Sequence, residues 1–138
     1  MTSDGAGLAR RIEIIESSYE FLLAYAAQGR QDDKGTEARP RLSAMYGALD
    51  GFAADTRALL SQPGSEFDID GFLSALERDA ASARGAIALV LRKTAISSLL
   101  VDNLNASVHL RALLTDAFLI EQSLRSTDQV QLAGSTAK

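Results

Sequence analysis

The chain has 138 residues, a net charge of −4 at neutral pH, and 46% hydrophobic residues. This size and composition are typical of one globular domain that buries its own core, and not of a disordered chain. Cysteine is absent, which excludes disulfides, thiolate nucleophiles and cysteine-ligated metal sites. The acidic balance and the scattered basic residues argue against nucleic-acid binding, because that mode requires a basic face.

The apolar segments are too short to cross a bilayer. Wholly apolar runs such as residues 86–91 and 117–120 are short, whereas a spanning helix needs about 20 apolar residues. The first seven residues lack the basic-then-apolar layout of a signal peptide. We therefore expect a cytoplasmic protein without a membrane span.

The first third of the chain predicts one amphipathic helix followed by an exposed connection. Ser3 or Asp4 is a suitable N-cap, and Gly29 can supply the left-handed residue after the helix. Residues 29–38 have no apolar period and are expected to be exposed. Apolar residues recur at spacings of four and three at Leu8, Ile12, Ile15, Tyr19, Leu22 and Ala26.

Two further helices are predicted in the middle of the chain. The second begins near Pro40, which is tolerated in a first helical turn, and is stopped by Pro63–Gly64. The third begins at Asp68 or Asp70. The predicted core stripe of the second helix consists of Leu42, Met45, Leu49, Phe52, Thr56 and Leu59. That of the third consists of Leu73, Leu76, Ala80, Ala83, Ile87 and Val90.

The last third of the chain carries the most regular stripe, but its start is ambiguous. The stripe consists of Leu99, Asn103, Ala106, Leu110, Leu113, Ala117, Ile120 and Leu124. No Gly or Pro separates Leu91 from Leu99. The chain could turn near residues 93–98, turn at residues 102–105, or form one helix from about residue 70 to 126. We favour one of the two turns, because a helix that long needs a partner along its whole length.

These patterns predict an all-α fold, an antiparallel up-down four-helix bundle formed by residues 7–126. Residues 1–6 and 127–138 are expected to be flexible tails.

Some helices have apolar residues outside their core stripes, which an isolated bundle does not need. Residues 86–91 and 117–120 are apolar on every side of a helix. The simplest explanation is a second interface in a symmetric homodimer. The predicted interface residues are Leu89, Leu91, Leu100, Leu114, Phe118 and Leu119.

His109 is the single histidine and lies at the edge of the last stripe. It is a candidate phosphoacceptor on a helical bundle, although the neighbouring acid that acts as a base in such transfer is missing. A histidine packed beside an interface is the simpler interpretation. One histidine also excludes a di-iron bundle site, which requires two Glu-x-x-His pairs. We therefore expect no metal and no cofactor.

Asn103 is a polar residue on the last stripe, and it is flanked by Asp102 and Asn105. In a continuous helix, a buried Asn103 would specify register and oligomeric state. In a turn, the same residues would be turn formers and caps. As a third alternative, they line a small ligand pocket.

Glu13, Glu16 and Glu20 lie on one face of the first helix and could hold a cation, although a solvated helix face is the simpler interpretation. The sequence as a whole favours a non-enzymatic interaction protein, a small dimeric adaptor or regulator that binds a partner protein. The alternatives are a phosphotransfer module that uses His109, a small-ligand sensor with a pocket near Asn103, and a protein that coats an apolar surface.

Overall fold

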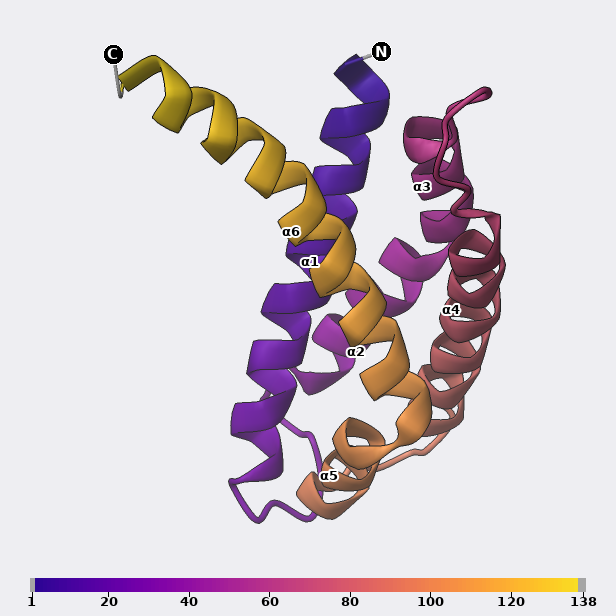
Figure 1. The fold of residues 1–138 in the computed structure, drawn as a ribbon. Helices are drawn as coiled ribbons and strands as arrows, with labels where there is room; N and C mark the ends of the chain where they lie inside the picture. The colour runs from indigo at the N-terminus through magenta and orange to yellow at the C-terminus, as the bar shows by residue number, and fades with distance from the viewer. Residues whose placement is uncertain (1, 137–138) are drawn as a thin grey trace.

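The computed structural model describes the backbone of residues 2–136 and the side chains of residues 5–125. In this part of the chain there are six α-helices and no strands (Figure 1). The all-α prediction is confirmed, but the described chain contains six helices where four were expected. The helices are α1 (Thr2–Ala26), α2 (Ala38–Leu49), α3 (Phe52–Leu60), α4 (Asp70–Leu91), α5 (Ser98–Ala106) and α6 (Val108–Thr136).

The helices surround one hydrophobic core. α1 and α4 each pack against α2, α3, α5 and α6, and the backbones of α1 and α4 do not approach each other in the described structure. The core therefore lies between α1 on one side and α4 on the other (Figure 1). None of the helices within the described residues is long and apolar enough to cross a membrane.

The predicted stripes of α1 and α4 form much of this core. In α1 the side chains of Leu8, Ile15 and Leu22 are completely buried. All six residues of the predicted α4 stripe are buried, and α4 begins at the predicted Asp70. Ser3 and Asp4 were predicted to precede α1, but the backbone of α1 is helical from Thr2. α6 continues to Thr136, across most of the segment predicted as a tail.

The predicted second helix is broken into α2 and α3 at Asp50–Gly51. Gly51 has a φ of 86°, a left-handed conformation that favours glycine. The Arg11 side chain of α1 stabilises this break, because its guanidinium donates to the carbonyl oxygen of Ala48 at 2.9 Å and to Asp55 at 2.7 Å. The stripe nevertheless stays in phase, and Leu42, Met45, Leu49, Phe52 and Thr56 are all buried.

The fourth predicted helix is broken as well. The turn between α4 and α5 covers residues 92–97, which agrees with the first of the three alternatives. The chain then breaks again at Ser107, where the Ser107 hydroxyl accepts a hydrogen bond from Leu110 N at 3.2 Å. Ser97 caps α5 in the same way through Leu100 N at 3.1 Å. The two hydroxyl caps explain why these short polar residues start new helices.

The break at Ser107 changes which residues of the predicted stripe face inward. Upstream of it the prediction is wrong, because Leu99, Asn103 and Ala106 are exposed. α5 instead buries Ser98, Val101, Leu104 and Asn105. Downstream of it the prediction is confirmed, and the buried stripe residues are Leu110, Leu113, Ala117 and Ile120.

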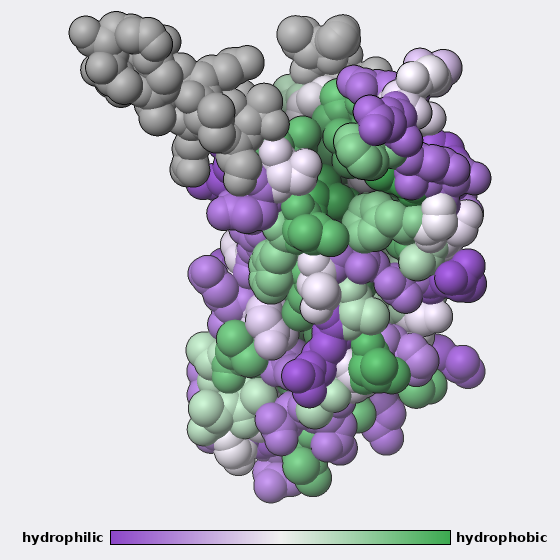
Figure 2. Space-filling model, viewed as in Figure 1, coloured by the Kyte–Doolittle hydropathy of each residue, from purple (hydrophilic) through white to green (hydrophobic). Residues whose placement is uncertain are grey.

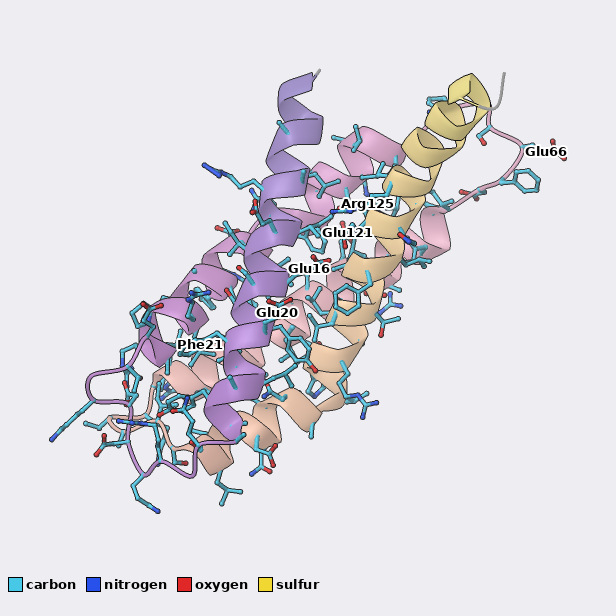
Figure 3. The ribbon with its side chains drawn as sticks, turned by 90° about the vertical axis from the view of Figure 1, so that its left-hand side faces the viewer. Glu16, Glu20, Phe21, Glu66, Glu121 and Arg125 are labelled. Carbon is cyan, nitrogen blue, oxygen red and sulfur yellow. The ribbon has the colours of Figure 1, made fainter. Side chains whose placement is uncertain are left out.

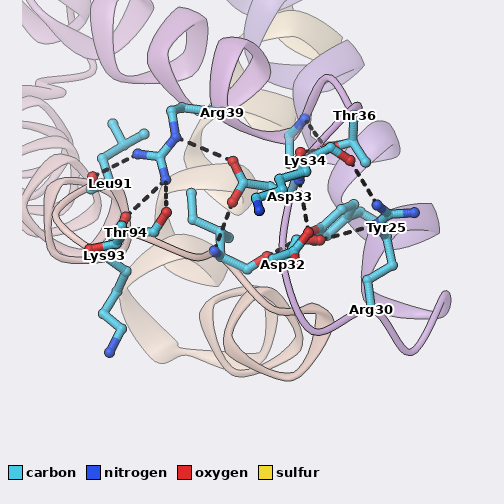
Figure 4. Close-up of polar contacts among 12 residues, drawn as sticks. Tyr25, Arg30, Asp32, Asp33, Lys34, Thr36, Arg39, Leu91, Lys93 and Thr94 are labelled. Atoms are coloured by element: carbon cyan, nitrogen blue, oxygen red, sulfur yellow. Dashed lines mark hydrogen bonds and ion pairs between the residues drawn. The ribbon is translucent and has the colours of Figure 1, made fainter.

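A hydrogen-bond network closes one end of the bundle by joining residues 30–39 to the turn after α4 (Figure 4). The Arg39 guanidinium donates to the carbonyl oxygens of Leu91 and Lys93 at 3.0 and 2.8 Å. The Asp33 carboxylate accepts from Ile96 N at 2.9 Å and from Arg39 at 3.3 Å. These interactions, led by the Ile96 N–H, lower the pKa of Asp33. Residues 29–38, which were predicted to be an exposed connection, therefore also help to hold this end of the bundle together.

Tyr25 anchors the same end from within α1. Its buried hydroxyl donates toward the carbonyl oxygens of Ile96 and Asp32, at 2.6 and 3.0 Å. The Ser98 hydroxyl donates to the carbonyl oxygen of Tyr25 at 2.7 Å and accepts from Arg30 N at 2.9 Å. Because these polar groups are satisfied by one another, we assign the network a structural role.

Candidate functional site

The predicted interface residues fall into three groups. Leu89, Phe118 and Leu119 are 67%, 43% and 59% exposed, so their side chains are available to a partner. Leu91 and Leu100 are partly buried and pack against the core. Leu114 is only 3% exposed and belongs to the core, because the buried stripe of α6 is wide enough to include it. Its apolar side chain needs no second interface.

His109 is exposed at the second position of α6. Its side chain makes no hydrogen bond or ion pair with the other described residues, so no acid is placed to act as its base. His109 is therefore accessible to a phosphoryl donor, but none of the described residues places a carboxylate beside it.

Asp102, Asn103 and Asn105 do not form one pocket. Asp102 and Asn103 are exposed on α5, whereas Asn105 is only 7% exposed. Asn105 Nδ2 donates to the carbonyl oxygen of Leu22 at 3.1 Å and so ties α5 to α1. The main hollows of the described structure are lined by other residues. Neither a turn nor a buried Asn103 is present, because residues 102–105 lie within α5.

A groove of about 480 Å³ lies between the N-terminal part of α1 and α6. Its walls are apolar at Ile12 and Leu124, and it carries the carboxyl groups of Glu16 and Glu121 (Figure 3). The predicted acidic face of α1 is therefore divided, since Glu13 and Glu20 are exposed while Glu16 is partly buried against α6. A larger hollow, about 620 Å³, is bordered mainly by the exposed loop at residues 61–68.

Glu16 and Glu121 form a carboxyl pair between α1 and α6. Glu16 Oε2 is inaccessible to solvent and receives no hydrogen bond when both groups are ionised. Burial, followed by a hydrogen bond with Glu121 and the repulsion of its charge, raises the pKa of Glu16 to about 7. Arg125 lies 3.2 Å from Glu121. Arg125 acts in the opposite direction on the pKa of Glu16, but burial and Glu121 outweigh it.

A second carboxyl pair joins α6 to α4. Asp116 Oδ2 is also inaccessible to solvent and has no hydrogen-bond donor among the described residues. Burial, followed by a hydrogen bond with Asp79, raises the pKa of Asp116 to about 7. No cation forms an ion pair with either aspartate within residues 5–125. Each pair can therefore hold one proton near neutral pH.

Sequence reasoning did not identify three of these four acids, namely Glu121, Asp79 and Asp116. A signal was present, because each one directly adjoins a residue of a predicted core stripe. Glu121 follows Ile120, Asp116 precedes Ala117, and Asp79 precedes Ala80. Such flanking positions lie at the edge of a buried helix face.

The described residues contain no group of three or more potential metal ligands. Comparison of the chain with models of protein families, with curated proteins and with solved structures finds no match.

Proposed function

We propose that this chain is a non-enzymatic helical interaction protein that associates with itself and binds a partner protein. The observation that carries the proposal is the exposure of large apolar side chains in the second half of the bundle. Leu99 and Val108 are 68% and 70% exposed, in addition to the exposed Leu89, Phe118 and Leu119. These five residues belong to α4, α5 and α6.

These residues are not needed for the core of a single chain. α4 already buries its complete inward stripe, and α6 buries Leu110, Leu113, Ala117 and Ile120 of its own. The outward leucines of both helices remain exposed to water. Burying apolar surface stabilises an association by roughly 25 cal/mol per Å², before the costs of association are subtracted. Figure 2 shows apolar residues on the face formed by α6 and α4, in areas separated by polar side chains. Polar residues around apolar contacts are typical of a protein interface.

We further propose that α2 with α3 and α5 with α6 act as two bent rods, so that the six helices form an antiparallel up-down arrangement of four rods. In this arrangement the outer sides of α4 and α6 form the contact between two copies. A symmetric dimer places the same surface of each copy in the interface, so each exposed leucine becomes buried in both copies.

Light scattering coupled to size exclusion tests the self-association. One chain has a mass of 14.7 kDa, and we expect a particle of twice that mass at micromolar concentration. Replacing both Leu89 and Leu119 with glutamate should give a monomer with an unchanged helical circular dichroism spectrum. The matched control is Phe67→Glu, because Phe67 is 77% exposed but lies in the loop before α4. A wild-type chain that stays monomeric at 100 µM would contradict the proposal.

The exposure of His109 supports one alternative function, a phosphotransfer module. If His109 accepts a phosphoryl group, incubation with acetyl phosphate should increase the mass of the chain by one phosphoryl group, roughly 80 Da, and His109→Gln should abolish the increase. An unmodified wild-type chain, or an equal increase in the variant, would rule this alternative out.

A further inference from the structure

Helix α6 contacts α1 through one pair of acidic side chains and α4 through another. Asp116 and Glu121 lie five residues apart, and five residues rotate an α-helix by about 140°. The two side chains therefore lie on opposite flanks of the core stripe that contains Ala117 and Ile120. On one flank Glu121 meets Glu16 of α1, and on the other Asp116 meets Asp79 of α4.

We propose that these two carboxyl pairs form a pH-sensitive latch, which holds α6 against α1 and α4 in mildly acidic solution and loosens it as the pH rises above neutrality. When one acid of a pair is protonated, it donates a hydrogen bond to the other acid. When both are ionised, no hydrogen remains between them and two like charges repel each other across the helix contact. The latch goes beyond the proposed self-association and does not depend on it.

Among residues 5–125, the surroundings of Glu16 do not provide a substitute donor. From α6, Glu121 and Arg125 face it, and Arg125 is already engaged with Glu121 at 3.2 Å. From α1 itself, Glu13 borders the same groove and Glu20 adds a further negative charge. Loss of the proton from Glu16 would therefore leave a solvent-inaccessible oxygen without a hydrogen bond, which is costly.

The surroundings of Asp116 are simpler. α4 contributes Asp79, and α5, the other helix packed against this end of α6, carries one charged residue, the exposed Asp102. No cation forms an ion pair with Asp79 or Asp116 within the described residues. The two pairs thus respond to pH in the same direction, one on each side of α6.

The direction of the effect follows from proton uptake. In the unfolded chain Glu16 and Asp116 lose their protons near their ordinary pKa values of 4.5 and 3.8, and in the folded chain both pKa values are raised to about 7. Between pH 4 and pH 7 the folded chain therefore binds more protons than the unfolded chain. The contribution of the two pairs to the free energy of unfolding therefore falls as the pH rises through this range, and it is complete only below about pH 4.

Thermal unfolding of the full chain between pH 5.5 and 8.5, in EDTA, tests the latch. We expect the Tm of the wild type to fall by about 5 °C or more over this range. In a variant that combines Glu16→Gln and Asp116→Asn, neutral amides replace the protonated acids and can donate to Glu121 and Asp79. This variant should unfold at a higher temperature than the wild type at pH 8.5, and the difference should narrow as the pH falls to 5.5.

Three controls separate the latch from other titrations. His109→Gln removes the only histidine, the side-chain type that ordinarily titrates near neutrality. Glu66→Gln removes an exposed acid in the loop between α3 and α4 (Figure 3). Both variants should keep the wild-type dependence on pH. The curves should also agree at 2 and 50 µM chain, since a dependence that arises from self-association changes with concentration.

Hydrogen exchange on the wild type provides a readout that needs no variant. After correction for the intrinsic effect of pH, amides in residues 110–125 should lose protection relative to those of α2 as the pH rises from 6 to 8. A wild-type Tm that is constant or rises with pH would overturn the proposal. So would an equal fall of Tm in the amide variant, or unchanged relative protection of α6.

Discussion

Replacing Tyr25 with alanine is expected to lower the free energy of unfolding by about 3–5 kcal/mol. The ring is completely buried and stacks on Phe21 with a centroid separation of 6.1 Å. The substitution removes this packing, and it also leaves the carbonyl oxygen of Ile96 without its donor. The carbonyl oxygen of Asp32 loses the hydroxyl but keeps Arg30 Nε at 3.1 Å. Urea denaturation followed by circular dichroism measures the loss.

Tyr25→Phe separates the two contributions. It retains the ring and removes only the hydroxyl, so the expected cost is about 1–2 kcal/mol. If the phenylalanine variant loses as much stability as the alanine variant, the hydroxyl and not the packing dominates. If the alanine variant loses less than about 1 kcal/mol, then Tyr25 does not anchor the end of the bundle as described.

The second large effect is expected at Arg39. Arg39→Ala should lower the free energy of unfolding by about 2 kcal/mol, because the guanidinium serves several acceptors at once. They include the carbonyl oxygens of Leu91 and Lys93 and the Asp33 carboxylate. The side chain is 37% exposed, so water can replace part of these interactions, and we expect less than for a fully buried arginine. Chemical denaturation at pH 7 measures the change.

Arg41→Ala is the matched control for Arg39, since both residues lie in the first turns of α2. Arg41 pairs with Glu37 at 3.2 Å on the surface and lies over the Phe21 ring at 5.3 Å. Such contacts contribute roughly 0.5–1 kcal/mol. Equal losses in the two variants would show that the network around Asp33 does not carry the stability assigned to it.

The amino-acid pattern was sufficient to predict the helices and most of the core, because helix periodicity is a local property. The α4 stripe and the α6 stripe after Ser107 are buried as predicted. The breaks at Gly51 and Ser107 were missed for a physical reason. The stripe continues in phase across Gly51, and the break there is supported by Arg11, which lies 37 residues away from Ala48 along the chain.

The candidate site was less predictable, because it depends on which helices become neighbours. A helical pattern shows that Glu16 lies at the edge of the buried face of α1, but it cannot show that the facing residue is another acid. The same limitation explains Leu114, which was assigned to a second interface although α6 buries it within the chain. The roles proposed for Leu89, Phe118 and Leu119 remain predictions that self-association experiments can test.

The contacts made by Tyr25 and Ser98 also constrain the order in which the molecule folds. They join residues that are 71 and 73 positions apart along the chain. During synthesis α1 therefore emerges well before the segment that closes this end of the bundle. The part of α1 that packs against α5 and α6 stays exposed until these helices follow, although α2 and α3 can cover the rest earlier. Long-range closure of this kind slows folding. We expect the nascent chain to pass through a stage in which α1 depends on transient contacts or on a chaperone.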